Sequence, residues 1–218
     1  MEDVTDKPPV IRTDNEKGMR SGLDGARHII LSGGIVAFPT ESFYGLAANA
    51  SDEDAIGRLF KIKKRRDNMP VLVLIPSLEY LKGYVADVPD VALRLIRNFW
   101  PGGLTLLFKA GSEISPLLTA GIGKIGVRIS SHPVAAALCR AVGSPITGTS
   151  ANISGKSGCV TAKEVYESLG IGVDLILDAG QTAGGKGSTI LDVTVSPPVI
   201  IREGMISREQ LQEVGIEF

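Results

Sequence analysis

The chain has 218 residues, a formal net charge of −1 and a hydrophobic fraction of 44%. These values are typical of a globular protein with a large core, and they argue against nucleic-acid binding through a generally basic surface. Two cysteines, Cys139 and Cys159, exclude a disulfide framework, and no Cys/His spacing typical of zinc is present. The polar N-terminus and the lack of an apolar run that could span a bilayer predict a cytoplasmic protein without a membrane segment.

The first third of the chain predicts helices alternating with strands. Helical spacing of apolar residues and a following Gly-Gly pair predict a helix over 22–34, which leads into a buried strand over 35–38. A second helix is expected over 51–66, with Ser51 as its N-cap, acids in its first turn and bases in its last turn. The β-branched run over 70–75 then predicts a buried strand.

The remainder continues this alternation. The predicted elements are helices over 89–100, 132–143 and 162–170, strands over 104–108, 125–130, 145–149, 174–178, 189–195 and 199–203, and a final helix opened by Ser207 and Gln210. We therefore expect an α/β fold in which residues 16–218 form a single domain with a mixed, largely parallel sheet and packed helices, after a flexible arm over 1–15. Ligands in such folds bind near the carboxyl ends of strands.

The run KIKKRR over 61–66 contains five cations in six residues. Bases at a helix C-terminus stabilise the helix dipole, and charge alone favours this role for Lys61, Lys64 and Arg66. A phosphate site is the alternative for Lys63 and Arg65, where Arg65 would grip oxygens as a bidentate fork and Lys63 would act as a compact charge.

Two other motifs resemble phosphate-binding loops only by letter. GQTAGGKGST over 180–189 nearly spells a P-loop, but Gly187 stands where Ser or Thr should hold magnesium, and a strand follows in place of a helix. GIGKIG over 121–126 precedes a strand, whereas a dinucleotide fingerprint follows one. His28 and His132 are poorly placed as catalysts, with a cap or turn role expected for His132. A reaction at phosphorus, which needs positioned cations and magnesium, fits this composition better.

Several segments in fixed order carry a resemblance to a known family: FPTESFYGLAANA, KIKKRRDNMPVLVLI, WPGGLTLLF, VRISSHP, TSANISG, STILD and VIIREG. Together they resemble the YrdC-like family of threonylcarbamoyl-AMP synthases from about Leu23 to Phe218. Its KxR and SxN signatures appear as Lys63-Lys64-Arg65 and Ser150-Ala151-Asn152. The resemblance implies a twisted α/β sheet with a concave basic cleft. It also implies condensation of L-threonine, bicarbonate and ATP, with Mg²⁺, into threonylcarbamoyl-AMP and pyrophosphate.

The resemblance also implies the roles of individual residues. Lys63, Arg65, Ser150 and Asn152 would be catalytic and would bind ATP. The further ATP contacts would be Gly158 and Arg202. The threonine contacts would be Thr40, Tyr44, Arg128, Gly148 and Ser188.

The implied product supplies the threonylcarbamoyl group of adenosine 37 in tRNA through a downstream transferase. Two positions depart from the family pattern, because Met69 replaces an Asn and Leu74 replaces a His near threonine. These departures leave two alternatives open. One is a YciO-like protein that binds tRNA or double-stranded RNA without this activity, and the other is a carbamoyl transferase with another acceptor.

Overall fold

The computed structural model describes residues 7–65 and 70–218. Arg66 and Met69, which the sequence singled out, lie outside these residues. The strands are β1 (Val10–Arg12), β2 (Val36–Pro39), β3 (Tyr44–Ala47), β4 (Val73–Leu74), β5 (Leu104–Lys109), β6 (Lys124–Arg128), β7 (Ile146–Thr147), β8 (Thr149–Ser150), β9 (Leu175–Asp178), β10 (Thr189–Asp192) and β11 (Val199–Arg202). The helices are α1 (Glu16–Leu31), α2 (Glu53–Lys63), α3 (Leu81–Tyr84), α4 (Asp90–Phe99), α5 (Pro116–Thr119), α6 (Pro133–Val142), α7 (Ala162–Leu169) and α8 (Arg208–Glu213), with short 3₁₀ turns at Leu78–Tyr80 and Gly170–Gly172.

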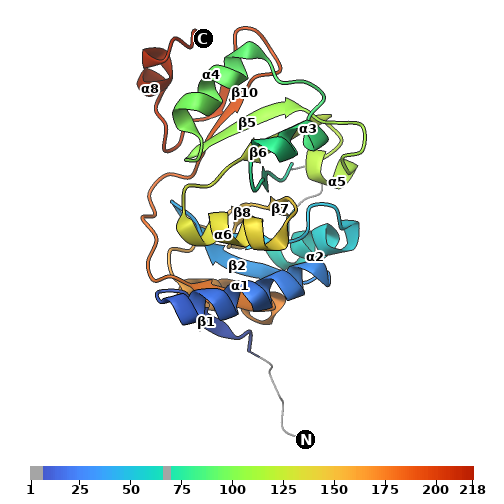
Figure 1. The fold of residues 1–218 in the computed structure, drawn as a ribbon, viewed down its shortest axis with the longest axis vertical. Coiled ribbons are helices and arrows are strands. Elements are labelled where there is room, and N and C mark those ends of the chain that lie inside the picture. The colour runs from blue at the N-terminus through green and yellow to red at the C-terminus, as the bar shows by residue number, and fades with distance from the viewer. Residues whose placement is uncertain (1–6, 66–69) are drawn as a thin grey trace, which may run out of the picture.

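Two mixed sheets, rather than the one that was predicted, form the framework. The first has the order β1-β9-β2-β3-β8, and the second has the order β11-β10-β5-β6-β4-β7 (Figure 1). The α/β class and the mixed pairing are confirmed. The expectation of a largely parallel sheet was too strong, because β2–β3, β5–β6, β10–β11, β3–β8 and β4–β7 are all antiparallel.

Helices α1 and α6 lie side by side against the first sheet in Figure 1. Beneath them a small core joins Ala26 and Ile30 of α1 with Leu138 and Cys139 of α6. Cys139 is therefore part of this core, with 2% of its surface exposed. The larger core fills the space on the other side, where α2, α4 and α7 pack against the strands. None of the helices in 7–65 and 70–218 is long and apolar enough to cross a membrane.

The N-terminal segment is more ordered than its composition suggested. Strand β1 pairs in parallel with β9, with Val10 opposite Ile176, so the prediction of a flexible arm is wrong for residues 10–15. Helix α1 also begins earlier than predicted, because the Asn15 side chain accepts a hydrogen bond from the Gly18 amide at 2.9 Å and caps it.

The N-caps of α2, α7 and α8 can be compared with the capping rules for helices. Asp52, not Ser51, caps α2 by accepting from the Ala55 amide at 3.0 Å. Thr161 caps α7 by accepting from the Glu164 amide at 3.2 Å, and the carboxylate of Glu164 accepts from the Val160 amide rather than from the Thr161 amide that a capping box would use. Ser207 and Gln210 open α8 as predicted, and they also form a complete capping box.

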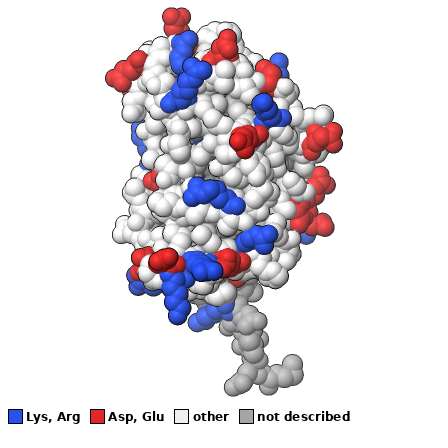
Figure 2. All heavy atoms as spheres, in the orientation of Figure 1, with Lys and Arg blue, Asp and Glu red and all other residues white. Residues whose placement is uncertain are grey.

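Charged side chains of both signs lie on the surface, and the face drawn in Figure 2 carries no single dominant patch of one sign. On the face seen in Figure 2, isolated Lys and Arg side chains alternate with Asp and Glu, and much of the central surface is uncharged. This agrees with the net charge of −1. Any strong positive field must therefore come from a local arrangement of cations.

Candidate active site

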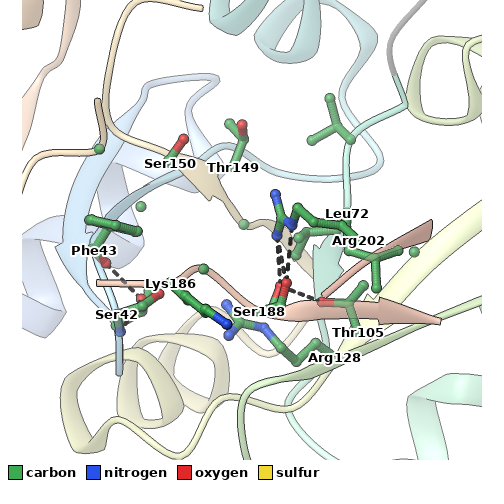
Figure 3. Close-up of a pocket in the computed structure, with 18 of the residues that line it drawn as sticks. Ser42, Phe43, Leu72, Thr105, Arg128, Thr149, Ser150, Lys186, Ser188 and Arg202 are labelled. Carbon is green, nitrogen blue, oxygen red and sulfur yellow. Dashed lines mark hydrogen bonds between the residues drawn. The ribbon is translucent and has the colours of Figure 1, made fainter. Parts of the chain in front are cut away.

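A cavity of about 520 Å³ lies between the two sheets and is lined by residues of both. Tyr44, Thr149 and Ser150 contribute from the first sheet, and Thr105 and Arg128 contribute from the second. Figure 3 shows side chains from these separate elements pointing into one space. The volume falls within the range of about 300–1,000 Å³ that is common for small-molecule sites.

The end of α2 explains how the basic run reaches this cavity. Lys64 adopts a left-handed conformation, with φ of 49°, and terminates the helix after Lys63. The chain direction changes there, so Arg65 lines the cavity while Lys61 and Lys64 remain exposed. The assignment of Lys61 and Lys64 to the helix end is consistent with this placement.

Lys63 points into the protein beneath the loop after β8. Its side chain is 1% exposed, and its Nζ donates to the carbonyl oxygen of Asn152 at 2.7 Å and to that of Ser150. Burial, reinforced by the nearby charge of Arg65, lowers the pKa of Lys63 to about 8. Lys63 does not itself line the cavity; it holds in place the loop that does.

The side chains of Ser150 and Asn152 bind each other and their own loop. Ser150 Oγ donates to Asn152 Oδ1, and Asn152 Nδ2 donates to the carbonyls of Ile153 at 2.9 Å and Lys156 at 2.6 Å. These bonds satisfy the 5% exposed Asn152 and fold the loop tightly. Both residues line the cavity, so the loop presents a fixed polar edge to a ligand.

Cations outnumber acids around the cavity. Among its described lining residues the acid is Glu203, and the cations are Arg65, Lys156, Lys186, Arg128 and Arg202. The guanidinium of Arg65 donates to the Pro70 carbonyl at 2.7 Å, and burial lowers the pKa of Arg65. Such a set of cations, of which Arg128 is buried and Lys156, Lys186 and Arg202 are exposed, is suited to a ligand that carries several negative charges.

The opposite wall is a network around Ser188. Arg202 donates to the Ser188 carbonyl through Nη2 at 2.7 Å and Nε at 3.2 Å, and Nη2 also reaches Ser188 Oγ at 3.3 Å. Thr105 Oγ1 donates to the same Ser188 hydroxyl at 2.9 Å (Figure 3). The pKa of Arg202 is lowered by burial and by the charge of Arg128.

Arg128 forms a buried ion pair at the inner end. Its Nη1 donates to Glu41 Oε1, and Ser130 Oγ donates to Glu41 Oε2 at 2.6 Å. The Arg128 side chain is 4% exposed, and burial lowers its pKa while Glu41 opposes that shift. An arginine in this position could bind a ligand carboxylate.

Thr40 and Tyr44 line the cavity, but their hydroxyls already have partners. Thr40 Oγ1 donates to the Phe43 carbonyl at 2.6 Å and so shapes the turn after β2. The Tyr44 hydroxyl donates to the Gly180 carbonyl at 2.7 Å, and burial together with the Asp178 carboxylate raises its pKa. Tyr44 therefore forms part of the cavity wall.

Gly148 and Gly158 lie where neighbouring side chains leave no space for a Cβ. A Cβ on Gly158 would lie 2.7 Å from the Phe43 ring, and one on Gly148 would lie 2.6 Å from Leu72 Cδ1. Leu74 is fully buried and lies directly behind Gly148, 2.9 Å from the same hypothetical Cβ. The departure at Leu74 thus lies behind the cavity wall that Gly148 forms.

The structure brings most of the predicted site residues together. The cavity lining contains ten of them, namely Thr40, Tyr44, Arg65, Arg128, Gly148, Ser150, Asn152, Gly158, Ser188 and Arg202, while Lys63 lies beneath it. Lys186 also lines the cavity, and a strand follows it, which confirms that its loop is not a P-loop. His132 caps α6 as predicted, since its Nδ1 accepts from the Val134 amide at 3.2 Å.

The sequence reasoning missed Thr105 and Glu41. Thr105 was visible as a single polar residue inside the apolar run LTLLF, and it faces the cavity from β5. Glu41 had no comparable signal, because only the fold places it beside Arg128 and Ser130.

These features define an α/β protein with a partly open, cationic cavity that is suited to a small anionic ligand. A family model named Sua5_yciO_yrdC, with the description "Telomere recombination", matches residues 28–204. The chain therefore belongs to this family, as its motifs indicated.

Similar proteins include several threonylcarbamoyl-AMP synthases. The one from Pyrococcus abyssi is 38% identical over 87% of this chain and 56% of its own length. A putative one from Mycobacterium tuberculosis is 39% identical over 88% of both chains. The chain thus spans about half the length of the P. abyssi relative and nearly the whole length of the M. tuberculosis relative.

Two solved structures show the same fold. P. abyssi Sua5 complexed with L-threonine has a TM-score of 0.89 and 36% identity, covering 95% of this chain and 61% of that one. Escherichia coli YciO has a TM-score of 0.78 and 32% identity, covering 90% of this chain and 95% of that one.

Proposed function

We propose that this protein is a threonylcarbamoyl-AMP synthase. The observation that carries the proposal is the convergence of Arg65, Arg202 and the Ser150–Asn152 loop on one cavity whose inner end holds Arg128. One part of this space is suited to polyphosphate and the other to a carboxylate. The similar P. abyssi protein was solved with L-threonine, which supports an amino acid as the second ligand.

In the proposed reaction, ATP enters as its Mg²⁺ complex. Among the described residues no group of three or more His, Cys, Asp or Glu is placed to hold a metal ion. The neutral amine of threonine adds to carbon dioxide derived from bicarbonate and gives a carbamate. A carbamate oxygen then attacks the α-phosphorus, the bond to the β-phosphate oxygen breaks, and pyrophosphate leaves with magnesium.

The protein's contribution is positioning and charge. Arg65 and Arg202 would neutralise phosphate oxygens, and the loop fixed by Lys63 would orient the nucleotide. Arg128 would bind the threonine carboxylate with a planar fork, and Ser188 would bind its hydroxyl or carboxylate. The two sheets would shield part of the cavity from water and so limit hydrolysis of the carbamate and of the mixed anhydride.

The proposed biological role follows from the product. Threonylcarbamoyl-AMP is an activated donor, so a transferase must pass its acyl group to an acceptor. We propose adenosine 37 of tRNA as that acceptor, in agreement with the activity for which the similar curated proteins are named. We also propose that this chain itself contacts tRNA.

The test is pyrophosphate release from Mg–ATP across a panel of amino acids, with and without bicarbonate. Release that requires both L-threonine and bicarbonate supports the proposal. L-serine and L-valine serve as matched substrates, because each lacks one of the two γ-substituents of threonine. The proposal is contradicted if pyrophosphate release requires neither L-threonine nor bicarbonate, or if another amino acid is preferred.

The second candidate function is RNA binding without adenylation. The observation in its favour is the likeness to YciO, which covers 95% of that chain. It predicts salt-dependent binding of structured RNA that persists in Ser150→Ala and Asn152→Ala. The synthase predicts that both variants lose pyrophosphate release. Measuring both properties on the same variants separates the two functions.

A further inference from the structure

Glu41 holds one edge of the Arg128 guanidinium at the inner end of the cavity. Its Oε1 accepts from Arg128 Nη1, and its Oε2 accepts from Ser130 Oγ at 2.6 Å. The side chains of Glu41 and Arg128 are only 10% and 4% exposed. The carboxylate is therefore fixed from two sides and cannot turn away from the arginine without losing both bonds.

The opposite edge of the guanidinium lacks a protein partner. Arg128 Nε is buried and has no hydrogen-bond partner among residues 7–65 and 70–218, although Arg128 lines the cavity. In an arginine, Nε–H and Nη2 share the edge that does not carry Nη1. Glu41 thus occupies one edge and leaves the Nε–Nη2 fork for a ligand. An unpaired buried donor is costly, which points to a ligand that completes it.

The Glu41–Arg128 ion pair also makes the inner end of the cavity less positive than the rest of its lining. Lys186 pairs with Glu203 at 3.8 Å, but that acid is 45% exposed, and Lys156 has no ion pair with an acid in the described part of the chain. Arg128 differs, because Glu41 contacts it directly and cancels most of its charge. A phosphate dianion is attracted mainly by net charge, whereas a carboxylate monoanion can be bound by the fork geometry.

We propose that Glu41 is a specificity-determining positioning residue, which orients and neutralises Arg128 so that this subsite accepts a carboxylate and rejects phosphate. This inference rests on the proposed function, in which Arg128 binds the amino-acid carboxylate. Without Glu41, ATP or pyrophosphate would compete for the amino-acid end of the cavity. The residue therefore keeps the two anionic ligands apart.

The test variant is Glu41→Gln. Glutamine has the same shape and can still accept from Arg128, but it removes the negative charge. The attraction of an anion to Arg128 grows with the charge of the anion. The substitution should therefore strengthen phosphate binding more than threonine binding. L-threonine binding is measured by calorimetry without ATP, and inorganic phosphate is then used to displace it. We expect the phosphate inhibition constant to fall about tenfold, with a smaller change in threonine affinity.

Two control variants isolate the charge. Glu167→Gln removes an exposed acid that pairs with Lys163 on α7, and we expect no change in phosphate competition. Ser130→Ala loosens the Glu41 carboxylate but keeps its charge. It should weaken threonine binding without admitting phosphate. Stronger phosphate competition in Ser130→Ala would overturn the argument from charge.

Weaker threonine binding in Glu41→Gln with unchanged phosphate competition would show a purely structural role and overturn the inference. A wild-type protein that binds no L-threonine would instead refute the amino-acid part of the proposed function. In that case the phosphate-induced rise in Tm still decides the inference. A larger rise in Glu41→Gln than in wild type supports it, and an equal rise overturns it, because the phosphate-binding cations are the same in both proteins.

Discussion

The ammonium of Lys63 lies 2.7 Å from the carbonyl oxygen of Asn152, a residue 89 positions later in the chain. This bond joins the end of α2 to the loop after β8, and a second bond to the Ser150 carbonyl strengthens the link. The KxR and SxN segments are thus one structural unit. Lys63 acts through the loop, while Arg65 is the member of the basic run that lines the cavity.

Lys63→Met should therefore lower stability as well as activity. Methionine fills the space of the 1% exposed side chain but leaves two carbonyls without their donor. We expect the free energy of unfolding to fall by about 1–3 kcal/mol, measured by urea denaturation. Lys61→Met, at an exposed position on the same helix, is the control and should change it by less than about 0.5 kcal/mol. An equal loss in both variants would contradict the proposed link.

The pH dependence of stability should carry the signature of Lys63. Its pKa is about 8 in the folded protein and 10.5 ordinarily. Below a pH of about 8, Lys63 carries its proton in both the folded and the unfolded state. The free-energy cost of burying its charge is then fully present. Between the two values the unfolded state binds more protons, so stability increases with pH. Relative to Lys63→Met, wild type should gain up to about 1.4 kcal/mol per pH unit in this window. A difference that is constant with pH would contradict this.

Local rules predicted much of the fold. The capping box of Ser207 and Gln210 and the cap at Thr161 depend on neighbours three residues away, and both form. The pairing of β2 with β9 and of β5 with β10 depends on strands far apart in sequence. Short-range patterns do not contain that information, so the division into two sheets was missed.

The site was predicted less evenly. The order of the motifs identified the residues that converge, but not the direction in which each side chain points. Lys63 faces inward because it lies on the buried face of α2 with Ile56 and Phe60, whereas Arg65 reaches the cavity because Lys64 ends the helix in a left-handed conformation. The burial of Glu41 against Arg128 required the strands to be assembled, so no pattern around Glu41 could reveal it.

Gly158→Ala should disturb the cavity wall through Phe43. The added methyl group would lie 2.7 Å from the ring, which must then move. We expect a loss of about 1–3 kcal/mol in stability and a raised KM for ATP, from unfolding and steady-state measurements. Gly57→Ala is the matched control, because nothing lies within 4 Å of its Cβ and alanine favours its helix. It should stabilise the protein by up to about 1 kcal/mol. Equal behaviour of the two variants would refute the steric argument.

Asn152→Asp should abolish the fixed geometry of the loop. Aspartate cannot donate to the carbonyls of Ile153 and Lys156, and its charge would repel them. We expect pyrophosphate release to fall about 100-fold, as misplaced binding groups commonly cause. Asn98→Asp loses a similar bond, to the Arg94 carbonyl at 2.8 Å, but on the exposed face of α4. It should retain activity, and a comparable loss there would point to a general effect of the substitution.

The central claim is that one cavity joins an amino acid, bicarbonate and ATP. Mass spectrometry of the product formed from Mg–ATP, L-threonine and ¹³C-bicarbonate tests it most directly. The account predicts an adduct of AMP and threonine that carries one ¹³C atom and appears together with pyrophosphate. An adenylate that lacks the labelled carbon, or no AMP adduct in the presence of all three substrates, would contradict it.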